Sequence, residues 1–383
     1  MDISISELDK SQSKNFNRFS DFRNSLYKTE KSFVKEGLSE FNLLLNQSSD
    51  FNKDYEWTAY LYSNYGKVVA RALLCRRKGS VDHLNLGYFE VIEDKDVFNI
   101  VYDHLESMAK SMGVKTIKWP VNANFFHSYR IKKDDDTPDL EPCYLLKSYY
   151  KKFFESKNYS VLRTWNNYVV PYEGYRSNCL EGIEFLRSKY DYFDDIKMRH
   201  LDKSNFKEDM RLFYSQLSKS FEDKGEYEPV SFEDFYSFYS GLKSIIRSEL
   251  INFSSYKEKD LGFMISYVDT IQAQRLKDKL EVLLPLPSFL ASPIAKIAAL
   301  IKLQEKPEKV YLSFVGKDDS KFDEEVKGVI LKHHLANIEY LDSISFTGDI
   351  YFTLLEVGSN SDLQSSKLAK VFNQYVLYSK DMD

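Results

Sequence analysis

Residues that could carry out metal or nucleophilic chemistry are few in this sequence and widely spaced. The 383-residue chain has six histidines and three cysteines. His333 and His334 are adjacent on a predicted helix, so their side chains face different directions and cannot chelate one metal ion by themselves. The other histidines have no ligand partners at a useful spacing, and the three aspartates at 134–136 lack the glycine and glutamate of a calcium loop. The sequence therefore predicts no metal site.

The cysteines and the apolar segments indicate the compartment. Cys75, Cys143 and Cys179 form no framework that could pair and no metal spacing, which favours a reducing compartment. The first residues show no basic start followed by an apolar stretch, so no secretory signal is visible. The longest apolar stretch, residues 293–303, contains two lysines and is too short to span a bilayer. We therefore expect a cytoplasmic protein without a membrane segment.

Composition narrows the class of partner. Apolar residues make up 43% of the chain and charged residues 29%, as in a soluble globular protein. A net charge of −5 argues against a nucleic-acid-binding protein, which normally carries a basic face. Aromatic residues make up 15% of the chain, and because they are bulky this share favours large hydrophobic cores over an aromatic ligand-binding site.

The most informative segment is a strand–helix–strand unit over residues 87–122. A short apolar strand leads to Asp94, which is placed to cap a helix. Apolar residues then recur at helical spacing up to Met112, and Gly113 ends the helix. A second strand follows and ends on Trp119 and Pro120.

The same order of elements occurs twice, as β-α-α-β-β-β-α-β-α-β. In the first half we predict strands and helices at 3–5, 16–26, 28–45, 57–62, 68–74, 86–92, 94–112, 114–119, 145–157 and 161–170. In the second half we predict them at 197–201, 206–221, 232–248, 250–256, 261–268, 310–315, 322–338, 350–357 and 375–378. The sequence thus predicts an N-terminal domain (1–172), a linker helix (173–195) and a C-terminal domain (196–383) with an insertion near 270–305.

Short motifs along nearly the whole chain resemble bacterial tandem proteins of the GNAT (N-acetyltransferase) superfamily. These motifs are Phe19-Ser20-Asp21-Phe22-Arg23, Gly66-Lys67-Val68-Val69-Ala70-Arg71, Gly87-Tyr88-Phe89-Glu90, Trp119-Pro120-Val121-Asn122, Ser148-Tyr149-Tyr150, Met198-Arg199-His200-Leu201-Asp202 and Tyr375-Val376-Leu377-Tyr378. The resemblance implies an α/β (α+β) protein of two tandem GNAT-like domains, each with a mixed, largely antiparallel sheet flanked by helices.

The resemblance also implies a function and a site. An acyl-CoA, acetyl-CoA or a longer one, would lie between splayed central strands, with its pyrophosphate at a helix start. The second half is the better candidate, because lysines there offset nearby acids. The cofactor-binding residues it implies are Val315, Gly316, Lys317, Ser320, Lys321 and Asn360. Glu356 is the implied base, and Tyr149 or Tyr150 the implied acid, because Phe154 stands where the family has tyrosine.

Acids at both helix starts leave the activity open. Two unit charges ~4 Å apart repel by about 1 kcal/mol in water and about 4 kcal/mol at an effective dielectric near 20. One hypothesis is an acyl-CoA-dependent N-acyltransferase that acts on a small-molecule amine. The alternative is a non-catalytic pseudo-acetyltransferase that binds a small molecule or a protein in the groove between its domains. A more distant option, a Fem-like aminoacyl transferase, would need a basic face. We expect a monomer or a homodimer.

Overall fold

The chain forms two compact units that each draw on both halves of the sequence. The computed structural model describes residues 2–30, 33, 35–124, 126–133, 146–222, 227–244, 246–269, 272, 276–277, 279–280, 283, 294–295, 298–299, 302–303, 305–317, 323–355 and 370–382, apart from a few side chains within these ranges. Unit 1 comprises Met1–Trp165, Glu228–Phe235 and Gln374–Asp383. Unit 2 comprises Asn166–Tyr227 and Tyr236–Asn373.

Unit 1 is built on a mixed sheet in the order β1-β2-β3-β4-β5-β13. Its strands are β1 (Ile3–Glu7), β2 (Tyr55–Asn64), β3 (Lys67–Arg77), β4 (His83–Val91), β5 (Thr116–Trp119), β6 (Ile131–Lys132), which pairs with β13, and β13 (Lys370–Asp381). Only β4 and β5 pair in parallel among the registers of this unit's described strands.

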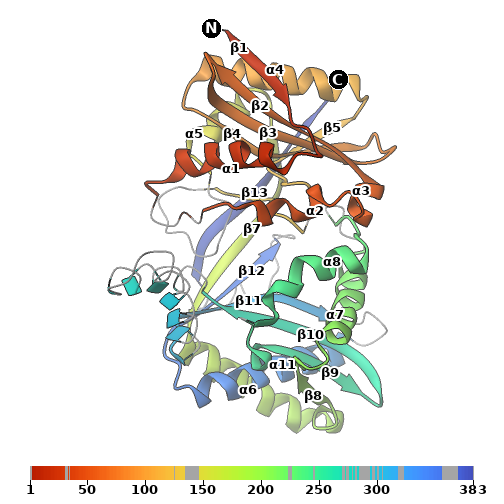
Figure 1. Cartoon of the computed structure of the whole chain (residues 1–383). Coiled ribbons are helices and arrows are strands. Elements are labelled where there is room, and N and C mark those ends of the chain that lie inside the picture. The colour runs from red at the N-terminus through yellow and green to blue at the C-terminus, as the bar shows by residue number, and fades with distance from the viewer. Residues whose placement is uncertain are drawn as a thin grey trace. The chain divides into compact units, whose positions relative to one another are not determined.

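Helices cover both faces of this sheet, with α4 and α5 on one side and α1 to α3 on the other (Figure 1). They are α1 (Ser13–Tyr27), the 3-10 turn η1 (Leu38–Phe41), α2 (Asn42–Leu45), α3 (Asp50–Asp54), α4 (Lys95–Ser111) and α5 (Tyr149–Glu155). The predicted apolar stripe of α4 is confirmed, because Val97, Phe98, Val101, Tyr102, Leu105 and Ala109 are all buried. These residues pack with the sheet and α5 into one core.

The helix predicted over residues 28–45 is wrong. The described part of this segment contains only the turn η1 and the single-turn α2. The reason lies at Glu36, whose backbone N–H and C=O both bond to the side chain of Asn24. Its buried carboxylate binds Arg71. These bonds replace the local hydrogen bonds that a helix would make.

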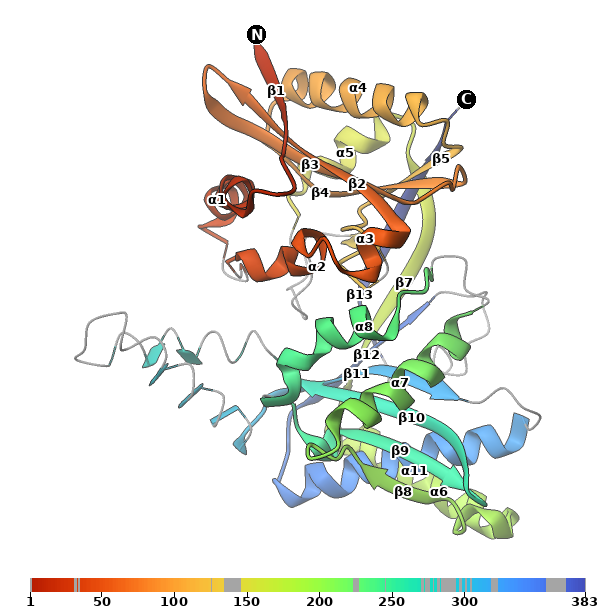
Figure 2. The same ribbon diagram turned by 45° about the vertical axis from the view of Figure 1, so that its right-hand side comes forward.

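Unit 2 has a sheet in the order β7-β12-β11-β10-β9-β8. Its strands are β7 (Ser160–Pro171), β8 (Lys197–His200), β9 (Ile251–Tyr256), β10 (Lys259–Val268), β11 (Lys309–Lys317) and β12 (Asp349–Leu355). Its helices are α6 (Tyr172–Lys189), η2 (Asp191–Phe193), α7 (Phe206–Phe221), α8 (Phe232–Tyr239), η3 (Ser240–Ser244), η4 (Ser248–Leu250) and α11 (Asp323–Ser343). α6 and α11 lie on one face, and α7 and α8 on the other (Figure 2).

The two sheets share one plan, which confirms the predicted repetition of elements. Each has antiparallel strands, then one parallel pair, which is β4–β5 in unit 1 and β11–β12 in unit 2. The strand beyond that pair comes from the other half of the sequence in both units, since β13 follows β5 and β7 follows β12. Each half of the chain therefore supplies the last strand of the other half's sheet.

Candidate functional site

Each sheet has a point where its parallel strands stop pairing, and main-chain groups beyond that point are not used in the parallel ladder. In unit 1, β4 pairs with β5 only from His83↔Thr116 to Asn85↔Lys118, although β4 continues to Val91. A strand edge without a partner offers N–H and C=O groups for such pairing.

In unit 1, the chain's own residues bond to this edge of β4. The C=O of Leu86 accepts a hydrogen bond from the N–H of Val121 at 3.0 Å. The N–H of Tyr88 donates to Oδ1 of Asn122 at 2.6 Å. A Cβ built on Gly87 would lie 2.1 Å from the C=O oxygen of Val121. The segment after β5 therefore lies directly against β4, and glycine is needed for that approach.

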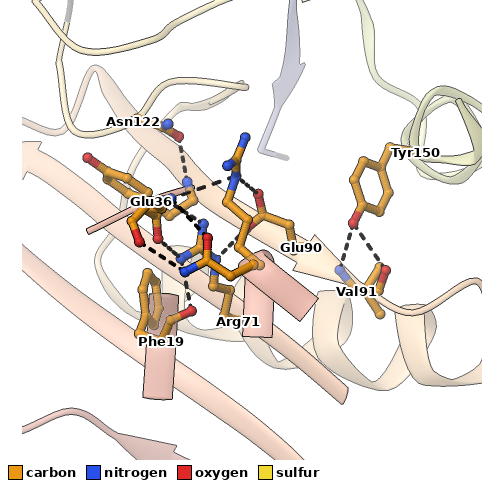
Figure 3. A network of polar contacts seen from close by, with 10 residues as sticks. Phe19, Glu36, Arg71, Glu90, Val91, Asn122 and Tyr150 are labelled. Atoms are coloured by element: carbon orange, nitrogen blue, oxygen red, sulfur yellow. Dashed lines mark hydrogen bonds and ion pairs between the residues drawn. The ribbon is translucent and has the colours of Figure 1, made fainter. Parts of the chain in front are cut away.

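Both candidate tyrosines bond to Val91 at the end of β4, and Figure 3 shows the bonds of Tyr150. The Tyr150 hydroxyl accepts from the N–H of Val91 at 3.0 Å and donates to the C=O of Val91 at 3.1 Å. The Tyr149 hydroxyl donates to the same C=O at 2.6 Å. Burial raises the pKa of Tyr150 well above its usual range and that of Tyr149 to about 12. Both hydroxyls are thus engaged with main chain, and their catalytic role stays a prediction.

Aromatic rings occupy the space beside these hydroxyls. Phe154 stacks on Trp119 with ring centroids 3.7 Å apart and meets Phe89 edge-on at 5.0 Å. Tyr150 also meets Phe89 edge-on. All four side chains are at most 1% exposed. The region between the ends of β4 and β5 is therefore packed with the chain's own side chains.

The helix that follows β4 is capped by an acid, as predicted. Oδ1 of Asp94 accepts from the N–H groups of Asp96 and Val97 at 2.9 and 3.0 Å. The C=O of Asp94 accepts from the N–H of Phe98. An incoming anion would compete with this carboxylate for the same amides.

A buried ionic network lies on the face of β4 that is opposite the aromatic rings (Figure 3). Arg71 binds Glu36 through both terminal nitrogens and Glu90 through Nε. Arg23 lies 3.3 Å from Glu90. The four side chains are at most 7% exposed, and their charges balance. The motifs contain Arg71 and Glu90 but do not indicate that these residues pair, because pairing depends on how β3 and β4 align.

Most candidate residues of the second half fall outside the described residues. Ser320, Lys321, Glu356 and Asn360 lie outside them, and so do the side chains of Val315 and Lys317. The backbone of residues 315–317 is described and forms the end of β11. There Val315, Gly316 and Lys317 pair with Met264, Phe263 and Gly262 of β10.

The parallel pair of unit 2 also stops pairing before its strands end. β11 pairs with β12 from Lys309↔Asp349 to Leu312↔Phe352. Both strands continue beyond this register, β11 to Lys317 and β12 to Leu355. The candidate residues 315–317 therefore lie on the part of β11 that extends beyond its parallel pairing.

The histidines and cysteines take part in internal contacts. His333 lies 3.0 Å from the Ser254 hydroxyl, whereas its neighbour His334 lies 2.8 Å from the Tyr175 hydroxyl, so the two rings face different elements. Cys75 and Cys179 are free and buried, and Cys143 lies outside the described residues. Within the described part of the chain, no cluster of three metal-ligating side chains occurs. In that same part, no helix is both long and apolar enough to cross a membrane.

Comparison with known proteins shows the fold. No protein-family model matches the chain, and no curated protein matches its sequence. A tandem GNAT protein from the clavulanic acid biosynthesis pathway matches 99% of this chain and 98% of its own length, with a TM-score of 0.53 and 9% identity. A probable N-acyltransferase from Enterococcus faecalis V583 matches 100% of this chain and 73% of its own length (TM-score 0.52, 10% identity).

A third structure agrees with these two. A GCN5-related N-acetyltransferase from Anabaena variabilis matches 98% of this chain and 72% of its own length, with a TM-score of 0.51 and 7% identity. The chain therefore has the tandem GNAT fold over its whole length, as the motifs predicted.

Proposed function

We propose that this protein is an acyl-CoA-dependent N-acyltransferase in which unit 2 holds the coenzyme and unit 1 does not. The proposal rests on a contrast between the parallel strand pairs β4–β5 and β11–β12 at the points where each stops pairing. In unit 1, the β4 edge is bonded by Val121, Asn122 and Tyr150 and its flank is filled with aromatic rings. In unit 2, β11 extends beyond its parallel pairing at the residues that the motifs assign to the coenzyme.

The residues of unit 2 fit an acyl-CoA by their chemistry. Main-chain groups of residues 315–317 would bind the pantetheine arm as an extra strand. The start of α11 with Lys317, Ser320 and Lys321 would hold the pyrophosphate, since helix N-termini and cations favour anions. Asn360 would bind the coenzyme as well. Glu356 would accept the proton of the attacking amine.

A thermal-shift titration with acetyl-CoA and longer acyl-CoAs tests this proposal. A ligand at 100 times its dissociation constant stabilises the native state by about 2.7 kcal/mol. We expect wild-type protein to melt at a higher temperature with coenzyme, and Lys317→Glu to abolish the shift. Lys95→Glu is the matched control, because Lys95 begins α4, the corresponding helix of unit 1. A shift that Lys317→Glu leaves unchanged would exclude this site.

The packing of unit 1 also favours a second candidate function, a non-catalytic acetyltransferase-like protein. If unit 2 is closed in the same way, millimolar acyl-CoA will leave the melting temperature of the wild type unchanged. In that case the fold serves to bind another small molecule or a protein.

A further inference from the structure

One short segment of the second half of the sequence belongs to unit 1 although its neighbours on both sides belong to unit 2. This segment, Glu228–Phe235, follows α7 and includes the first turn of α8. It is joined to unit 1 by contacts at each of its ends, and we refer to it as the clasp.

The first contact is a partly buried histidine–glutamate pair. Nε2 of His83 bonds to Oε1 of Glu228, and Nδ2 of Asn85 lies 3.5 Å from the same oxygen. The side chains of His83 and Glu228 are 22% and 15% exposed. Burial by itself raises the pKa of Glu228, but His83, together with the Tyr55 hydroxyl and Lys118, outweighs this effect, so the net pKa is lowered. The partners of Glu228 therefore stabilise its carboxylate in a position that is largely shielded from water.

The second contact lies at the other end of the clasp. Oδ2 of Asp234 accepts from the N–H of Phe51 in α3 at 2.5 Å. Asp234 is 4% exposed. Phe235 meets Phe126 edge-on at 5.8 Å. A side-chain carboxylate thus anchors each end of the segment.

The clasp is attached differently from the other second-half segment of unit 1. β13 is held by main-chain pairing with β5 from Tyr378↔Trp119 to Asp381↔Thr116. The clasp, in contrast, bonds to unit 1 through the side-chain carboxylates of Glu228 and Asp234. A carboxylate that stays buried after losing its partner costs free energy, whereas a carboxylate exposed to solvent is hydrated. Such an element opens locally without unfolding the rest of its unit.

We propose that Glu228–Phe235 is a conformational clasp that closes on unit 1 through His83–Glu228 and Asp234–Phe51 and opens as one piece when either contact is lost. Opening uncovers Asn85 of β4. The proposal is independent of coenzyme binding, since it concerns the apo protein.

Two readouts in the full-length chain report the state of the clasp. The Phe51 amide is hydrogen-bonded to Asp234 when the clasp is closed, so its hydrogen exchange measures opening. Chymotrypsin cleavage after Phe232 or Phe235 measures opening a second way, because Phe235 is buried. The variants are His83→Ala, which breaks the first contact, and Asp234→Asn, which weakens the second. His104→Ala is the control, since this histidine of α4 bonds to Tyr62 instead.

We expect His83→Ala to raise both rates by about tenfold or more, as loss of a hydrogen bond to a charged group does. Asp234→Asn should act in the same direction, and His104→Ala should change neither rate. Amides of β3 and β4 should exchange as in the wild type. Unchanged Phe51 exchange in His83→Ala would overturn the proposal, because the two ends would then not be coupled. An equal increase throughout unit 1 would overturn it as well, because the segment would then not open on its own.

Discussion

Replacement of Tyr150 by phenylalanine separates a structural role of this residue from a catalytic one. The change keeps the ring in its packing against Phe89 but removes the hydroxyl that bonds to both the N–H and the C=O of Val91. The C=O keeps its bond from the Tyr149 hydroxyl, whereas the buried N–H loses its partner. An unsatisfied buried donor costs about 1–3 kcal/mol.

We therefore expect Tyr150→Phe to lower the free energy of unfolding of unit 1 by about 2 kcal/mol. For a unit of this size, this corresponds to a fall in its melting temperature of about 4–8 °C. Tyr149→Phe is the matched comparison, because it removes only one bond to a C=O that remains bonded. It should cost about 0.5–1 kcal/mol.

The assay is urea unfolding of the two variants and the wild type, with the acyl-CoA-induced melting shift measured beside it. Tyr150→Phe should lose stability and keep the coenzyme-induced shift of the wild type. A variant that is as stable as the wild type but has lost acyl transfer to an amine would refute the reasoning. It would place Tyr150 in the reaction instead of in the packing of unit 1.

Three further predictions follow from contacts of unit 1. Glu90→Gln leaves Arg71 and Arg23 with an uncompensated buried charge and should cost about 3–5 kcal/mol in urea unfolding, and a cost below ~1 kcal/mol would contradict the buried network. A chain that ends at residue 369 lacks β13, the strand that pairs with β5. The unfolding transition of unit 1 should then be absent in calorimetry. A transition that is retained would show that unit 1 folds without β13. Burial raises the pKa of Glu106, but its bonds to Lys380 and Lys110 have the larger effect, so the net pKa is lowered. The stabilisation of the folded state by Glu106 is therefore present above the pKa of the unfolded state and is lost as pH falls through the pKa of the folded state. Glu106→Gln should flatten stability against pH in that acidic range, and an unchanged slope would contradict the assignment.

Sequence periodicity predicted the elements well where one face of an element is apolar. The stripe from Val97 to Ala109 and the cap at Asp94 depend on neighbouring residues alone, and both are found in α4. The same reasoning predicted a helix over residues 28–45 that is not found, because Glu36 is bound to Arg71, which is distant in sequence.

The arrangement of strands and the role of the candidate tyrosines were beyond sequence reasoning. Which sheet β7 and β13 each join depends on pairing with strands that are distant in the sequence. Tyr149 and Tyr150 lie within a predicted helix, but their bonds to Val91 require the end of β4 to lie beside α5. The motifs named these two tyrosines but gave no indication that their hydroxyls bond to the main chain of Val91.

The contrast between the two units can be measured directly by hydrogen exchange with and without saturating acetyl-CoA. We predict slower exchange in β11 around Val315–Lys317 and at the start of α11, with unchanged exchange from Leu86 in β4 to Phe98 in α4. Protection at β4 and α4 instead, or equal protection in both units, would contradict the account.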